Sequence, residues 1–279
     1  MRRHLLPWLI GLAASSALAA LFFLAEVRDE DARIDGFVRA TTHGIPRADT
    51  EAVALALSRG VFRETNRTIR ADGLPLYERL ESTSPFNVTS AVSLEHGVWG
   101  VEGRAHDGPC GTMTRVTLGA LDRAGIAARK LHITDESGTQ DGWHTLLEFR
   151  SGGRWLVLSP SDSAFVWRAH DGSIATLDEI QTDSAIFAEI FEPFPSYPYR
   201  VDHATHIRWE KLPRPVRTLA RMILGPAAYE HAFTPRLYDQ PRRLFFITSL
   251  AALGAFGLGA LLVSSPWRSG PRGSPPPHQ

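Results

Sequence analysis

Mostly apolar residues occupy two stretches of the chain, one near each end, at 5–25 and 244–267. Neither stretch contains a charged residue. A helix rises about 1.5 Å per residue, so either stretch is long enough to cross the ~30 Å hydrocarbon core of a bilayer. The pattern predicts two transmembrane helices with a globular region between them.

A cleaved signal peptide is the alternative for the first stretch. Arg2 and Arg3 precede it, and Ala17 to Ala19 place small residues where a signal peptidase cleaves. The apolar run continues through Leu24, which favours an uncleaved anchor. Either interpretation sends the central region across the membrane, because Arg2 and Arg3 stay on the cytoplasmic side.

Arginines on the inner flanks of the two stretches oppose this orientation. Arg28 and Arg33 follow the first stretch, and Arg242 and Arg243 precede the second. We expect the central region to be extracytoplasmic. Arginines far outnumber lysines, as is typical of proteins from GC-rich bacterial genomes. Together with the two predicted spans, this makes the inner membrane of a bacterium the expected location.

Within the central region, apolar positions recur at helical spacing in two segments. One begins at Thr50, which is placed to cap the helix, and includes Val53 and Leu57. The other begins at Cys110 and ends before Gly125, a residue suited to the C-terminal cap. Cys110 is therefore expected at the N-terminus of a helix.

Strand-like patterns follow this second helix. Residues 126–134 suit a strand, and the runs 143–149 and 154–158 form a hairpin joined by Arg-Ser-Gly-Gly at 150–153. A further helix is expected at 176–192. The pattern predicts an α+β domain in which a helix packs on an antiparallel sheet of at least three strands.

The predicted organisation divides the chain into seven parts. These are a tail at 1–4, a span at 5–25, an irregular charged stalk at 26–49, the α+β domain at 50–180, a C-terminal extension at 181–243, a span at 244–267 and a disordered tail at 268–279.

The extension contains an amphipathic segment. Arg214, Arg217 and Arg221 share one helical face, and Val216 and Leu219 lie on another. Such a helix close to a span suits an anionic membrane surface. A helix packed on its own domain with a solvated basic face is the alternative.

Overall charge and cysteine content narrow the function classes. The formal net charge is zero, so composition gives no reason to expect a nucleic-acid partner. The chain has one cysteine, which excludes an intramolecular disulfide.

Cys110 and His144 are candidates for nucleophilic catalysis. A helix N-terminus lowers the pKa of a thiol, and an adjacent imidazole lowers it further by taking the proton. His144 begins a strand of the sheet on which the Cys110 helix is expected to pack, so the two side chains can meet there. The backbone N–H of Cys110 is placed to serve as one oxyanion donor.

The segments "GPCGTMTRVTLGALDRAGIAAR", "WHTLLEF" and "GGRWLVLSP" resemble the core of the transglutaminase-like superfamily. The pattern has a cysteine opening a helix, a "GIPAR"-type turn, a histidine opening a strand and a strand of "GRWxxxDP" type. The resemblance covers about residues 50–180 and implies a papain/transglutaminase-like core. It also implies a Cys-His-Asp triad that acts through a thioester, with Cys110 as nucleophile and His144 as base.

The third member of the triad departs from the family. Ser159 occupies the aspartate position, and Asp162 is the nearby carboxylate that can replace it. The resemblance implies a membrane-anchored protease, amidase or acyl transferase acting on protein or peptide amides at the bacterial envelope. The alternative is a catalytically silent domain that binds envelope assembly partners.

No cofactor is expected. His96, His106 and His132, with Asp107 or Asp135, lack the close spacing of common metal sites. Trp143 and Trp155 are expected in the core rather than beside the cysteine, although Trp99 is a weaker candidate for lining a cleft.

Overall fold

The chain folds into a long N-terminal helix, an α+β region and a second long helix, as seen in a computed structural model. The structure describes residues 2–68, 108–135, 144–161, 166–186, 199–207, 209, 213–230, 232–233 and 240–265. Contacts divide the chain into two compact units, Met1–Val27 with Arg242–Gln279, and Arg28–Pro241.

In the first unit two apolar helices pack together. They are the N-terminal part of α1 (Arg2–Thr41) and α10 (Pro241–Ser264). Both helices are long and apolar enough to cross a membrane. They run antiparallel, because Phe23 stacks on Phe245 with ring centroids 5.2 Å apart while Gly259 faces Leu9. Glu26 pairs with the Arg242 guanidinium at 3.3 Å, near the end of the apolar stretch of α1. The two spans expected from the apolar stretches are thus helical and packed together.

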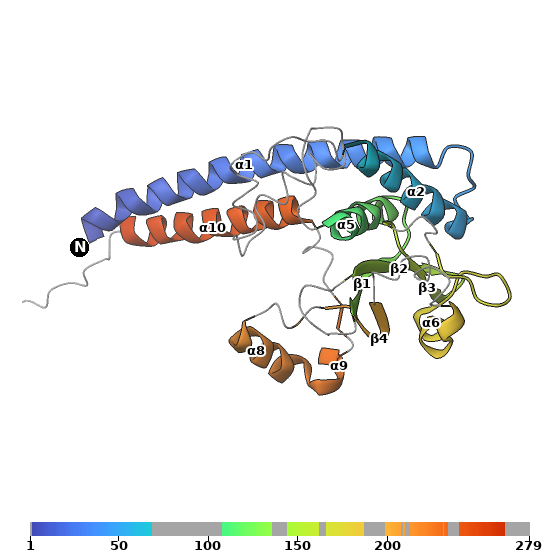
Figure 1. The fold of residues 1–279 in the computed structure, drawn as a ribbon. Helices are drawn as coiled ribbons and strands as arrows, with labels where there is room; N and C mark the ends of the chain where they lie inside the picture. Colours follow the sequence, from blue (N-terminus) through green and yellow to red (C-terminus); the bar gives the residue numbers. More distant parts are fainter. Residues whose placement is uncertain are drawn as a thin grey trace, which may run out of the picture. The chain divides into compact units, whose positions relative to one another are not determined.

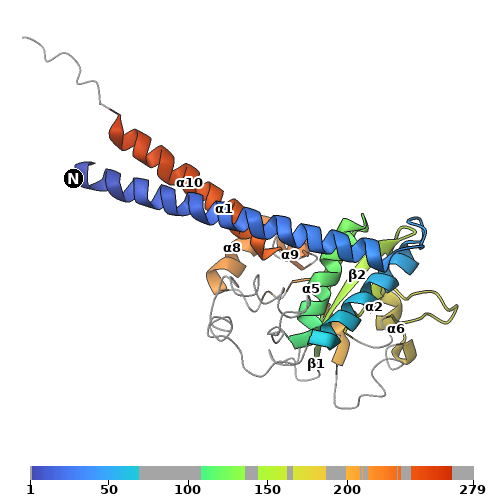
Figure 2. The same ribbon diagram turned by 90° about the horizontal axis from the view of Figure 1, so that it is seen from above.

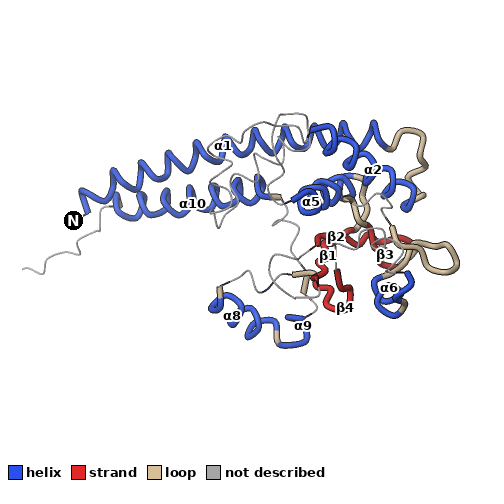
Figure 3. Tube along the Cα trace, in the orientation of Figure 1, coloured by secondary structure: helices blue, strands red, loops and turns tan. Residues whose placement is uncertain are grey.

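A four-stranded antiparallel sheet organises the second unit. The strands are β1 (Ala128–Asp135), β2 (His144–Ser151), β3 (Arg154–Leu158) and β4 (Tyr199–Thr205), in the order β3-β2-β1-β4. Figure 3 shows the strands gathered in one sheet. The expected antiparallel sheet of at least three strands is confirmed. Strand β4 lies in the segment treated from sequence as an extension, so the sheet has one strand that the sequence pattern did not indicate.

A two-residue turn sets the register of β2 and β3. Gly152 and Gly153 both have positive φ, 55° and 84°, which residues with a Cβ adopt only with strain. Ser151 pairs with Arg154 across the turn, and Leu147 pairs with Leu158. Since the strands are antiparallel, the beginning of β2 lies beside the end of β3.

Two helices cover one face of the sheet, α2 (Thr50–Thr68) and α5 (Gly108–Arg123). Figure 2 shows them side by side across the strands. The α2 helix is capped by the Asp49 carboxylate, which accepts the N–H of Ala52 at 3.0 Å. The expected cap, Thr50, is instead the first helical residue.

The core beneath these helices is apolar. Its largest members are Leu57, Leu121, Leu147, Phe149 and Leu158, all almost completely buried. The α5 helix ends in a Schellman motif at Gly125 (φ 79°), where the N–H of Ile126 donates to the Leu121 carbonyl at 2.9 Å. The expected end of this helix is confirmed, and its start lies two residues before Cys110.

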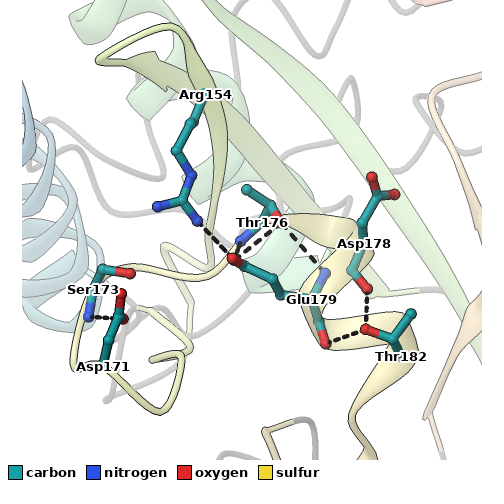
Figure 4. A network of polar contacts seen from close by, with 7 residues as sticks. All are labelled: Arg154, Asp171, Ser173, Thr176, Asp178, Glu179 and Thr182. Atoms are coloured by element: carbon teal, nitrogen blue, oxygen red, sulfur yellow. Dashed lines mark hydrogen bonds and ion pairs between the residues drawn. The ribbon is translucent and has the colours of Figure 1, made fainter.

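The opposite face of the sheet is covered by residues 166–186, including α6 (Leu177–Thr182) (Figure 1). Trp167 and Ile180 pack there against Ile133 and Val157. Thr176 caps α6 in a capping box with Glu179, and the Glu179 carboxylate also accepts Arg154 at 2.8 Å (Figure 4). These contacts fasten α6 to the beginning of β3. Part of the helix expected at 176–192 is therefore present, and 187–192 lies outside the described residues.

Residues 28–41 continue the first helix into the second unit. The expected irregular stalk at 26–49 is therefore wrong over 26–41, where the charges lie on a helix whose Phe37 and Val38 pack against the core. Arg123, at the end of α5, pairs with Asp31 and lies 3.7 Å from Asp35. Residues 28–41 of α1 are therefore part of the packing within the second unit.

A charged cluster is buried on the face that carries α6. The Glu148 side chain is 2% exposed. Its Oε2 lies 2.6 Å from Arg129 Nε and 2.6 Å from His206 Nε2, and it accepts a hydrogen bond from each. The Arg129 guanidinium also lies 4.3 Å over the Trp155 ring. Burial raises the pKa of Glu148, but the hydrogen bonds from His206 and Arg129 outweigh it and hold this pKa below its ordinary value. The cluster joins β1 and β2 to the segment that follows β4.

Two short helices, α8 (Arg214–Leu224) and α9 (Pro226–Glu230), follow the sheet. The segment expected to be an amphipathic helix is helical. None of the residues of α8 is buried.

Candidate active site at the start of helix α5

Three of the four candidate site residues come from the edges of adjacent elements. Cys110 lies in the first turn of α5, His144 is the first residue of β2, and Ser159 directly follows β3. The antiparallel pairing of β2 with β3 brings His144 and Ser159 together, and the packing of α5 on β2 brings Cys110 to them. The fourth candidate, Asp162, lies outside the described residues.

Ser159 contacts the imidazole of His144. Its Oγ lies 3.4 Å from Nε2, at the long end of hydrogen-bond distances. His144 is 5% exposed and Ser159 is completely buried. The histidine therefore has a neutral hydroxyl at one ring nitrogen, in a place sheltered from water.

Cys110 lies within hydrogen-bonding reach of the same imidazole. Burial is the largest influence on the thiol and raises its pKa. The hydrogen bond and charge of His144, together with the backbone N–H groups of Thr145 and Gly111, outweigh burial and hold the Cys110 pKa below its ordinary value. The expected contact between cysteine and histidine is thus present in the structure.

A hydrogen bond fixes the helix against the strand at this point. Thr114 is one turn after Cys110 on α5, and its Oγ1 donates to the Thr145 carbonyl at 2.9 Å. His132 Nδ1 lies 3.2 Å from Thr145 Oγ1 on the neighbouring strand. Thr145 is therefore held through both its carbonyl and its side chain while its N–H faces the thiol.

Thr114 and Thr145 were not indicated as site residues by the sequence. One signal was available: Thr114 is a polar residue four positions after Cys110, on the helix face that turns toward the sheet. Thr145 is next to His144 in the chain, but a strand alternates its side chains, so adjacency does not predict a contact with α5.

The aromatic and metal candidates from the sequence lie elsewhere or are not described. Trp155 is near the start of β3, opposite Arg150 in register, and thus several residues from Ser159. Trp143, Trp99, His96, His106 and Asp107 lie outside the described residues. Within the described ranges, no group of three His, Cys, Asp or Glu residues is placed to hold a metal ion.

What the site offers chemically is an ionisable thiol, a base that can take its proton and a buried hydroxyl behind that base. No protein-family model, no curated protein and no solved structure matches the chain. The function proposed for the chain therefore rests on the geometry of this site.

Proposed function

We propose that the chain is a membrane-anchored cysteine enzyme that cleaves or transfers acyl groups of protein or peptide amides through a thioester. The single observation that carries this proposal is the contact of Cys110, in the first turn of α5, with His144. A thiol with a lowered pKa beside an imidazole is the arrangement that makes cysteine a nucleophile near neutral pH.

The proposed reaction has two stages. His144 takes the thiol proton, and the Cys110 thiolate attacks the carbonyl carbon of an amide. The C–N bond breaks as His144 returns that proton to the leaving amine, which leaves the acyl group on the sulfur. Water or a second amine then attacks the thioester carbonyl, His144 takes the proton of this nucleophile, and the thiol is restored.

Within this proposal, Ser159 orients the imidazole. In the imidazolium form both ring nitrogens carry protons, and the Nε2 proton points to an acceptor at the position of Ser159 Oγ. A hydroxyl can accept a hydrogen bond from this N–H but adds no negative charge to stabilise the imidazolium. In such a site, the charge that stabilises the His144 imidazolium comes mainly from the Cys110 thiolate.

We extend the proposal to fold and location. The helix-on-sheet arrangement, with a cysteine at the helix start and a histidine at the strand start, supports a papain/transglutaminase-like core. The two apolar helices support a membrane protein. Arg2 and Arg3 support an extracytoplasmic domain at the bacterial inner membrane.

A second candidate function rests on Ser159. The neutral partner at Nε2 favours a silent domain that retains the fold of an enzyme and binds envelope assembly partners. The two functions differ in whether the thiol can be acylated.

The experiment that tests the proposal uses the full chain in detergent and an activated ester, p-nitrophenyl acetate. We expect a burst of nitrophenolate equal to the protein concentration, with the acetyl group on Cys110 by mass spectrometry and release of that group by hydroxylamine. Both Cys110→Ala and His144→Ala should lose the burst. Acylation of Cys110 at an equal rate in wild type and His144→Ala would contradict the proposed enzyme and favour the silent domain.

A further inference from the structure

Helix α8 exposes an apolar face that no described part of the chain covers. Val216, Leu219, Met222 and Ile223 point to one side of the helix, and Met222 and Ile223 are 70% and 73% exposed. A single exposed apolar residue is ordinary, but four on one helical face mark an interaction surface. We call these four residues the α8 apolar face.

The other side of α8 is strongly basic. Arg214, Arg217 and Arg221 lie together opposite the apolar face, and α8 contains no acidic residue. Within the described residues, none of these three arginines takes part in an ion pair. The helix therefore combines an apolar face with an uncompensated positive charge.

Contacts between the segments on either side of α8 fix both ends of this helix. Gly225 (φ 76°) ends it, and a stack of Trp209 on Tyr229, with centroids 4.0 Å apart, joins the chain before α8 to α9 after it. The Trp209 indole N–H also donates to the Tyr229 carbonyl at 3.1 Å. An amphipathic helix that is fixed at both ends loses less conformational entropy on binding than a free segment does.

The length of the chain between α8 and α10 limits how far apart these two helices can lie. The helix ends at Leu224 and the apolar helix α10 begins at Pro241. The roughly 16 residues between them reach at most about 55 Å even when fully extended at ~3.3–3.6 Å each. The tether keeps α8 at a high effective concentration near the bilayer that α10 is apolar enough to enter.

We propose that α8 is an interfacial helix that lies on an anionic lipid surface. The α8 apolar face enters the boundary between headgroups and acyl chains, and the three arginines reach anionic headgroups through their long side chains. This inference concerns the attachment of the domain to the bilayer, and it is independent of the chemistry at Cys110.

The test uses the full chain in nanodiscs, with one fluorescent label on an introduced cysteine. In a Cys110→Ala background, Leu219→Cys places the label at the centre of the α8 apolar face, and Thr218→Cys places it at the border between that face and the arginines. Nanodiscs contain phosphatidylcholine alone or with phosphatidylglycerol, and each lipid mixture is prepared with and without nitroxide-labelled acyl chains.

We expect the nitroxide to quench the label at 219 several-fold more than the label at 218, and to do so only when phosphatidylglycerol is present. Replacing Arg214, Arg217 and Arg221 together with glutamine should reduce the quenching at 219 to the level at 218. Equal quenching at both positions, or none at 219 with anionic lipid, would overturn the proposal. The second result would leave a protein partner or a second copy as the occupant of the α8 apolar face.

Discussion

Thr114 Oγ1 donates to the Thr145 carbonyl across 2.9 Å, and this hydrogen bond joins the helix that carries Cys110 to the strand that begins at His144. Both threonines are buried. The bond lies one helical turn from Cys110 and one residue from His144. It therefore holds the helix and the strand together beside the thiol and the imidazole, in addition to the apolar packing of α5 on β2.

Thr114→Val should disturb the site without changing its chemical groups. The substitution keeps the shape of the side chain and removes one buried hydrogen bond, which costs about 1 kcal/mol. We expect alkylation of Cys110 by iodoacetamide at neutral pH to slow several-fold, measured by mass spectrometry.

Thr117→Val is the matched control for this change. Thr117 is also completely buried on α5, but its Oγ1 has no hydrogen-bond partner in the described part of the chain. Replacing an unsatisfied buried hydroxyl with a methyl group should leave the alkylation rate unchanged and keep or raise the melting temperature. Equal slowing in the two variants would show that Thr114 acts only through general stability.

Ser159→Asp should increase acylation if the proposed enzyme is correct. A carboxylate reaches one bond further toward His144 Nε2 than the serine Oγ does, and its charge stabilises the imidazolium. We expect the burst with p-nitrophenyl acetate to be about ten-fold faster. Ser159→Asn has the same shape without the charge and should not produce this gain. If Asp and Asn behave alike, charge behind the imidazole does not limit the reaction.

Gly60→Ala should destabilise the second unit. A Cβ at Gly60 would lie 2.8 Å from Phe37 Cζ and 3.0 Å from Thr41 Cγ2, and Phe37 is itself packed against the core. Forcing these groups apart costs about 1–3 kcal/mol, more than the ~1 kcal/mol that alanine adds to helix propensity.

The control for Gly60 is Gly119→Ala. Its Cβ would meet Ile34 Cδ1 at 3.5 Å, an ordinary contact, so this change should keep or raise the melting temperature of the full chain in detergent. A Gly60→Ala variant as stable as Gly119→Ala would refute the close packing of α1 on α2.

The Glu148 cluster makes the folding stability depend on pH. Because the pKa of Glu148 is lower in the folded chain than in the unfolded one, its contribution is complete above the ordinary value of about 4.3 and is lost as pH falls through the folded pKa. Glu148→Gln should cost about 3 kcal/mol at neutral pH, since it leaves Arg129 and His206 without their carboxylate. The difference in melting temperature between wild type and variant should shrink at low pH. A difference that stays constant with pH would contradict a paired carboxylate.

The parts of the fold that follow local rules were predictable from the sequence. Gly125 marked the end of α5, the Gly152-Gly153 pair marked the hairpin turn, and two long uncharged, mostly apolar stretches marked α10 and the first part of α1. Cys110 and His144 were also predictable, because Cys110 lies in the first turn of a helix and His144 begins a strand, and local pattern identifies both elements.

Tertiary contacts decided the rest. Residues 28–41 carry many charges, so their sequence has no clear apolar stripe. This part of α1 is stabilised by tertiary contacts: Phe37 packs against the core, and Arg123 of α5 pairs with Asp31. Strand β4 has an irregular register with β1 between His132 and Thr134, so it lacks a clear alternation. The hydrogen bond between Thr114 and Thr145 depends on the packing of a helix on a sheet, and the spacing of Thr114 from Cys110 does not identify Thr145 as its partner.

The central claim is that His144 controls the ionisation of Cys110, and the pH dependence of Cys110 alkylation tests it most directly. Cys110 is the only cysteine in the chain, so every alkylation event reports on this thiol. His170→Ala removes a largely exposed histidine that pairs with Asp183 instead, and it should leave the profile unchanged.

In the wild type, the rate should rise with pH around a midpoint below the value of about 8.5 for a free thiol. In His144→Ala, the midpoint should move up to that value or above it, because burial remains and the imidazole is gone. The same midpoint near 8.5 in both proteins would contradict the account.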